Sequence, residues 1–140
     1  MPRFHAMKSL PVLPIVLALL SSLPAGAGER FDLDGSWASA IENCDKIFVR
    51  QGNRTTLSED SDLYGGGFNI DGNRVTGKMA RCTITNRKDA GDAIHMLASC
   101  ATDIMYSSVQ LSVKVRDKNS ITRIFPGMDE IQINYQRCPR

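Results

Sequence analysis

The fold is decided by residues 82–100, CTITNRKDAGDAIHMLASC, where two runs of alternating apolar and polar residues flank Gly91. This pattern predicts a β-hairpin with strands over 78–86 and 93–101, because glycine accepts the positive φ of a tight turn. Cys82 lies nine residues before Gly91 and Cys100 nine after it, so the hairpin places the two cysteines opposite each other. Facing residues on neighbouring strands are close enough to be bridged. We therefore predict a Cys82–Cys100 disulfide.

The same period of two continues on both sides of this hairpin. Turn signals at Asp71-Gly72-Asn73 and Asp117-Lys118-Asn119 separate the alternating runs. The clearest half-buried strand has Val109, Leu111, Val113 and Val115 on one face. In the last strand, Ile131, Ile133 and Tyr135 are expected to share a face. Besides the two strands of the hairpin around Gly91, the strands expected after residue 64 lie at residues 67–70, 74–76, 109–115, 121–125 and 131–136.

The residues before position 64 are less regular. A short strand is expected at 47–49 and another at 35–41, although a single helix over 36–45 is the alternative to the latter. Residues 51–63 are polar and have no period, which predicts a loop.

These runs together predict an all-β fold, an antiparallel meander of seven to eight strands that forms a small barrel or a sandwich. With Cys82 and Cys100 paired, Cys44 is left to pair with Cys138. This second disulfide would join the first strands to the last, as closure of a barrel requires. The chain is therefore expected to carry two disulfides.

The N-terminal segment has the layout of a secretory signal. Lys8 precedes an apolar run over 10–20, and Ala25-Gly26-Ala27 is a small-x-small cleavage motif. We expect residues 1–27 to be a signal peptide cleaved after Ala27, with Met1 or Met7 as the start, and residues 28–140 to form one secreted or periplasmic domain. Export would allow all four cysteines to oxidise.

Charge and hydropathy exclude two classes of partner. Arg3 and Lys8 would leave with the signal, which brings the 17 basic residues down to the number of acidic residues, 15. Nucleic-acid binders usually carry a basic excess, so we expect no nucleic-acid partner. No run after the signal approaches the roughly 20 apolar residues of a membrane span. A monomer that binds a protein or a small ligand is the expectation.

Motifs for catalysis or metal binding are weak. His95 is the one histidine after position 27, and a single histidine does not make a zinc site when the cysteines form disulfides. The acidic run 59–62 lacks the spacing of a calcium loop, and the glycines at 65–67 lack the lysine of a phosphate loop. We therefore predict a protein that is not an enzyme, with no catalytic residues, no metal and no cofactor.

Gly35-Ser36-Trp37 stands at the start of the first expected strand, and this Gly-x-Trp motif resembles the opening motif of lipocalin and wider calycin barrels. The resemblance implies that Trp37 packs at the closed end of a barrel, beneath a basic residue from a late strand, Arg137 or Arg123. In size and expected export, the chain is most similar to bacterial periplasmic inhibitors of secreted metalloproteases. That likeness implies an inhibitory arm over residues 28–33, with Arg30 and Phe31 as its larger side chains.

Three functions follow as expectations. The first is a non-enzymatic secreted binding module, either a protease inhibitor or a small-ligand binder, since barrels of about eight strands can enclose one ligand. The second is a structural or envelope interaction protein. The third is a small secreted hydrolase, which would be favoured by a hydrogen bond from His95 to a carboxylate inside a cleft and removed by a buried or isolated His95.

Overall fold

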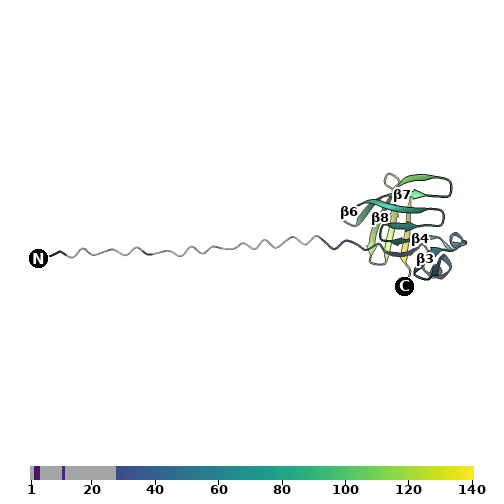
Figure 1. Cartoon of the computed structure of the whole chain (residues 1–140), viewed down its shortest axis with the longest axis horizontal. Helices are drawn as coiled ribbons and strands as arrows, with labels where there is room; N and C mark the ends of the chain where they lie inside the picture. Colours follow the sequence, from purple (N-terminus) through teal and green to yellow (C-terminus); the bar gives the residue numbers. More distant parts are fainter. Residues whose placement is uncertain (1, 4–10, 12–27) are drawn as a thin grey trace.

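The computed structural model describes residues 2–3, 11 and 28–140. Apart from Pro2, Arg3 and Pro11, the expected signal peptide, its cleavage motif and both candidate start codons lie outside the described residues. From residue 28 onward the chain forms a β-barrel, and residues 28–34, the N-terminal segment, lead into it at one end (Figure 1).

The barrel is closed and has eight antiparallel strands, as the alternating sequence pattern predicts. The sheet order is β1-β10-β9-β8-β7-β6-β5-β4, and β1 closes the circle by pairing with both β10 and β4. The sequence left a barrel and a sandwich open, and the structure is a barrel. The strands are β1 (Gly35–Ala38), β4 (Gly67–Asp71), β5 (Arg74–Thr76), β6 (Arg81–Ala90), β7 (Ala93–Ala101), β8 (Tyr106–Asp117), β9 (Ser120–Ile124) and β10 (Gln132–Arg137).

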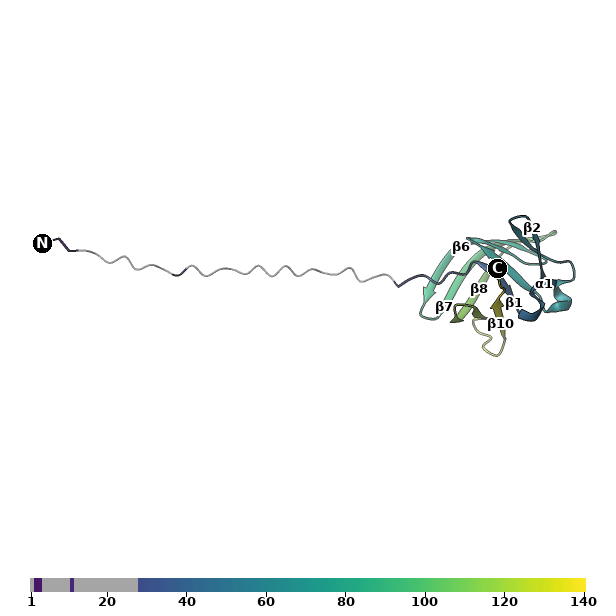
Figure 2. The same cartoon turned by 90° about the horizontal axis from the view of Figure 1, so that it is seen from below.

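The segment between β1 and β4 leaves the barrel wall and forms a small subdomain at its side (Figure 2). It contains η1 (Ile41–Asn43), α1 (Cys44–Ile47), β2 (Phe48–Gln51), β3 (Arg54–Leu57) and η2 (Ser61–Tyr64). The expected loop at 51–63 is therefore wrong in part, because β3 pairs with β2 in a separate hairpin. The single helix over 36–45 is also wrong, since helical turns begin only at Ile41, after β1 has ended.

Apolar side chains fill the barrel interior. Trp37 and Ile121 are almost completely buried, and the rings of Phe68 and Tyr135 pack edge to face with centroids 4.8 Å apart. The buried members of this core are Leu33, Trp37, Ile70, Val75, Ile94, Met96, Val113, Ile121 and Tyr135. Ile131, which was expected to share a face of the last strand with Ile133 and Tyr135, instead lies before β10 and is exposed.

The β6–β7 hairpin brings Cys82 and Cys100 together as register partners, and they form the predicted disulfide. The turn has two residues, Gly91 and Asp92, so Ala90 faces Ala93. An unbroken ladder from that pair would place Cys82 opposite Ala101. A register shift between Ile84 and Asn86 adds one residue to β6 and restores the Cys82–Cys100 pairing.

The second predicted disulfide, Cys44–Cys138, is also present. It joins the first residue of α1 to the residue that follows β10. Around it a second apolar cluster forms, with Ala38 and Ile47 fully buried and Phe48 and Tyr64 packed against them. The side subdomain is therefore fixed to the C-terminal strand by a covalent bond and by its own small core.

Within residues 2–3, 11 and 28–140, no helix has the length and apolar character that crossing a membrane requires.

Candidate functional site

Trp37 and Arg137 form a stacked pair where the N-terminal segment enters the barrel. The guanidinium carbon of Arg137 lies 4.4 Å from the Trp37 ring centroid, and the Trp37 indole N–H donates to the Leu33 carbonyl at 2.8 Å. Gly35 adopts a φ of +134°, and a Cβ at this position would lie 3.3 Å from the Arg137 guanidinium. Arg123, the other residue expected over Trp37, instead lies over the ring of Phe125.

Arg137 also holds the N-terminal segment by hydrogen bonds to its backbone. Its guanidinium donates to the carbonyls of Asp32 at 2.8 Å, Asp34, and Lys118 at 3.0 Å. These bonds connect the segment before β1 to the β8–β9 turn. The cluster therefore lies over one end of the barrel. The guanidinium donors of Arg137 are occupied by carbonyl groups of the chain itself.

The expected inhibitory arm is partly anchored and partly free. Phe31 packs on the barrel core, and its carbonyl accepts a hydrogen bond from Arg87 at 2.8 Å. Gly28, Glu29 and Arg30 are exposed, and their backbone extends away from the barrel without forming a β-strand (Figures 1 and 2). With Phe31 they line a shallow hollow of about 680 Å³ beside the β6–β7 turn. The residues before Phe31 are therefore exposed, whereas Phe31 itself packs on the core.

Asp89 orients the arginine that anchors this segment. Arg87 donates to Asp89 from Nε at 2.7 Å and from Nη2 at 3.0 Å, and Arg30 lies 3.9 Å from the same carboxylate. The hydrogen bonds from Arg87 and the nearby positive charges hold the pKa of Asp89 below its ordinary value. The carboxylate therefore stays ionised and keeps Arg87 directed at the Phe31 carbonyl.

His95 is hydrogen-bonded to a hydroxyl and not to a carboxylate. Its Nδ1 lies 2.9 Å from the Ser112 Oγ on the outer face of the barrel. Ser112 is 1% exposed, so a substrate cannot reach its hydroxyl, and neither residue lines the hollow beside the β6–β7 turn. Neither His95 nor Ser112 lines the larger hollow described below.

The acidic run at 59–62 has a structural role. Asp62 pairs with Lys78 and thereby ties η2 to the β5–β6 loop. This hydrogen bond lowers the pKa of Asp62.

Among the described residues, no group of three or more His, Cys, Asp or Glu side chains is placed to hold a metal ion. The glycines at 65–67 lead into β4, and a Cβ on Gly67 would lie 2.3 Å from the Trp37 carbonyl oxygen.

The larger hollow is a groove of about 870 Å³ between the β2–β3 hairpin and the outer face of the barrel. One wall comes from β2, β3 and the turn between them. The other wall is the outer face of β4, β5 and β6, where Arg74 faces Thr83 and Thr76 faces Arg81 across the strands. These residues point outward because Val75 and Cys82, which alternate with them, point into the barrel.

Six arginines line this groove, and they come from both walls and from the C-terminal end. We call it the arginine groove; its arginines are Arg50, Arg54, Arg74, Arg81, Arg137 and Arg140. Three aspartates share the lining, Asp34, Asp45 and Asp71, so positive charge predominates. Arg74 pairs with Asp71 at 2.9 Å, and Arg137 is used at the barrel end. Within residues 28–140, Arg50, Arg54, Arg81 and Arg140 have no carboxylate within ion-pair distance.

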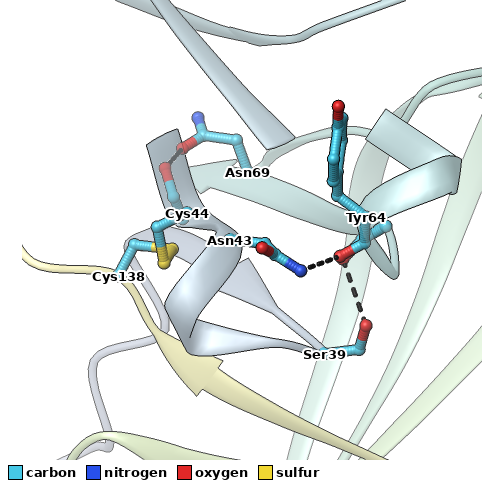
Figure 3. The surroundings of a disulfide bond; sticks show 8 residues. Ser39, Asn43, Cys44, Tyr64, Asn69 and Cys138 are labelled. Atoms are coloured by element: carbon cyan, nitrogen blue, oxygen red, sulfur yellow. Dashed lines mark hydrogen bonds between the residues drawn. A yellow bond between two sulfur atoms is a disulfide. The ribbon is translucent and has the colours of Figure 1, made fainter. Parts of the chain in front are cut away.

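Cys44 and Cys138, which are joined by a disulfide (Figure 3), both line the arginine groove. Beside it, Asn43 donates to the Tyr64 carbonyl at 3.2 Å, and the Ser36 hydroxyl donates to Asn69 Oδ1 at 2.8 Å. These bonds hold η1 against η2 and β1 against β4. The disulfide therefore fixes α1, which leads into the β2–β3 wall, to the residue that follows β10.

The arrangement can bind carboxylates or other anionic groups. A guanidinium presents donors in a fixed fork that matches a carboxylate, and hydroxyl and amide groups of Thr55, Thr76, Thr83 and Asn53 add neutral partners. The sequence interpretation missed this groove because its arginines are spread over 90 positions and form no cluster along the chain. Only strand pairing brings them together.

No protein-family model, curated protein or solved structure matches this chain.

Proposed function

We propose that this protein is a non-enzymatic extracytoplasmic binding module that holds an acidic segment of a partner protein in the arginine groove. The observation that carries the proposal is the set of four groove arginines without a carboxylate partner among the described residues. Two disulfides support an oxidising compartment such as the periplasm or the cell exterior. A role as an envelope interaction protein would use the same surface and would differ only in the identity of the partner.

A ligand inside the barrel is disfavoured, because apolar side chains fill the interior. Within the groove, a peptide with separated carboxylates fits better than a uniform polyanion. Asp34 and Asp45 lie among the arginines and would repel a continuous run of phosphates or sulfates. Phe48 is the one aromatic side chain in the lining, so unpaired bases would find few surfaces for stacking.

Binding is tested with a fluorescein-labelled ten-residue peptide of alternating Glu and Ser, followed by fluorescence anisotropy. The double variant Arg50→Gln/Arg81→Gln removes one free arginine from each wall. We expect about a tenfold rise in Kd, since a charge-assisted contact at a partly exposed site contributes about 0.7 kcal/mol. The Kd of the unaltered protein should also rise with ionic strength.

The matched control is Lys88→Gln/Lys118→Gln, which removes two positive charges that do not line the groove. We expect its Kd to change by less than about twofold. Equal weakening in both double variants would show attraction by overall charge and would contradict the groove proposal. Tighter binding of a labelled ten-nucleotide oligothymidine than of the peptide would contradict the choice of an acidic protein segment.

A second candidate function, inhibition of a secreted metalloprotease, is favoured by the exposed backbone at Gly28, Glu29 and Arg30. These residues leave the barrel just before the point where Arg87 holds the Phe31 carbonyl. An anchored base with a free, extended end lowers the entropic cost of placing the end in a protease cleft. If the chain is cut after Ala27, Gly28 becomes the end that enters first.

The exported protein should then inhibit a secreted zinc metalloprotease in a peptide-cleavage assay. Deletion of residues 28–30 should raise the inhibition constant at least about tenfold, because these residues would supply the contacts in the cleft. The Arg50→Gln/Arg81→Gln variant serves as the control and should inhibit like the unaltered protein. Equal inhibition with and without residues 28–30 would remove this candidate.

A further inference from the structure

One stretch of the barrel wall has a strand neighbour on one side only. β8 pairs with β7 along its length from Tyr106 to Lys114, whereas its pairing with β9 begins at Ser112. β9 ends at Ile124, which faces Ser112, so residues 106–110 extend beyond it. We call residues 106–110 the free β8 edge.

The backbone groups on this edge can be assigned from the register. The Val115 N–H donates to the Asp92 carbonyl at 2.7 Å, on the β7 side. Successive residues of a strand direct their N–H and C=O groups to alternate sides. Tyr106, Ser108 and Gln110 therefore direct theirs away from β7. Within residues 28–140, no backbone hydrogen bond from the β9–β10 loop reaches them.

The free β8 edge lacks the features that usually protect such an edge from pairing. Its sequence, YSSVQ, contains no charged residue, proline or glycine. Ile104 and Met105 precede it and are 93% and 61% exposed, and Tyr106 is 74% exposed. The edge is thus an uncharged, already formed strand beside exposed apolar side chains.

We propose that a second copy of this chain docks on the free β8 edge, with the two edges antiparallel about a two-fold axis at Ser108. Ser108 would face Ser108 of the second copy, and Tyr106 would face Gln110 of the second copy. The three facing pairs can exchange about six backbone hydrogen bonds, and no like charges meet. A second copy is favoured over a flexible partner segment because its strand is already ordered, so pairing loses little conformational entropy. Self-pairing of one patch is also the commonest symmetry of homodimers. The proposal is independent of the arginine groove.

The test is sedimentation equilibrium of the oxidised exported protein between about 10 µM and 1 mM. We expect the weight-average mass to rise from that of a monomer toward that of a dimer across this range. Ser108→Lys places two ammonium groups face to face and should weaken the dimer at least about tenfold. The control, Gln136→Lys, puts a lysine on β10, whose two edges are both paired, and should leave dimerisation unchanged.

Amide hydrogen exchange supplies a second readout that does not depend on a variant. The N–H groups of Tyr106, Ser108 and Gln110 should gain protection at the high end of the concentration range and exchange freely at the low end. A monomer at 1 mM would overturn the proposal. It would also be overturned by a dimer in which these three amides exchange as fast as in dilute solution.

Discussion

Replacing Cys44 and Cys138 together with serine is expected to lower the free energy of unfolding by about 4 to 5 kcal/mol. The two cysteines are 94 positions apart, and a cross-link that closes so long a loop removes much of the conformational freedom of the unfolded chain. The bond also holds α1 beside the end of β10, so the β2–β3 hairpin should become mobile relative to the barrel. Urea unfolding followed by circular dichroism measures the first effect.

The matched comparison is the Cys82→Ser/Cys100→Ser variant, whose loop spans 18 positions. Its expected loss is smaller, about 3 kcal/mol, because a shorter loop confines the unfolded chain less. Binding of the acidic peptide should weaken in the Cys44→Ser/Cys138→Ser variant and stay near its normal value in the other. A larger stability loss from the Cys82–Cys100 pair would contradict the role given to the long-range bond.

Trp37→Ala is expected to lower the free energy of unfolding by about 3 to 5 kcal/mol. The indole is fully buried in the core, and its removal leaves a large cavity. The Leu33 carbonyl would lose its hydrogen-bond donor, and Arg137 would lose the ring beneath its guanidinium. Because Trp37 is the single tryptophan of the chain, the variant must be followed by circular dichroism instead of fluorescence.

Two further variants separate the parts of this effect. Trp37→Phe keeps an aromatic ring but loses the indole N–H, and we expect a loss of about 1 to 3 kcal/mol. Leu97→Ala removes a side chain from the outer face of β7, where it is 48% exposed, and should change stability by less than about 0.5 kcal/mol. A loss below 1 kcal/mol for Trp37→Ala would show that the barrel end does not depend on this residue.

The strand pattern could be predicted from the sequence because one face of each barrel strand is buried. Ile94, Met96 and Ala98 lie inside, and Leu97 lies outside, as the alternation requires. The pairing of Cys82 with Cys100 was predicted correctly, but from a turn centred on Gly91. The turn has two residues, and the register shift beside Thr85 compensates for the difference. A polar stretch such as TITN carries no signal for such a shift.

The side subdomain could not be predicted in the same way. β3 has the sequence RTTL and pairs with β2 outside the barrel sheet. Its residues do not alternate between apolar and polar, so the sequence gives no sign of a strand here. The arginine groove lies between this hairpin and the barrel, and its position depends on how the two pack. Net charge was also a poor guide, because equal numbers of acidic and basic residues after position 27 conceal an uneven distribution in space.

The binding of an acidic segment in the arginine groove is tested most directly by a nuclear magnetic resonance titration with the Glu-Ser peptide. We expect the Nε–H signals of Arg50, Arg54 and Arg81 to shift together and saturate with the peptide, while the amide of Gly91, which does not line the groove, stays unchanged. Shifts that gather at Gly91, or no shift in the arginine signals at saturating peptide, would contradict this proposal.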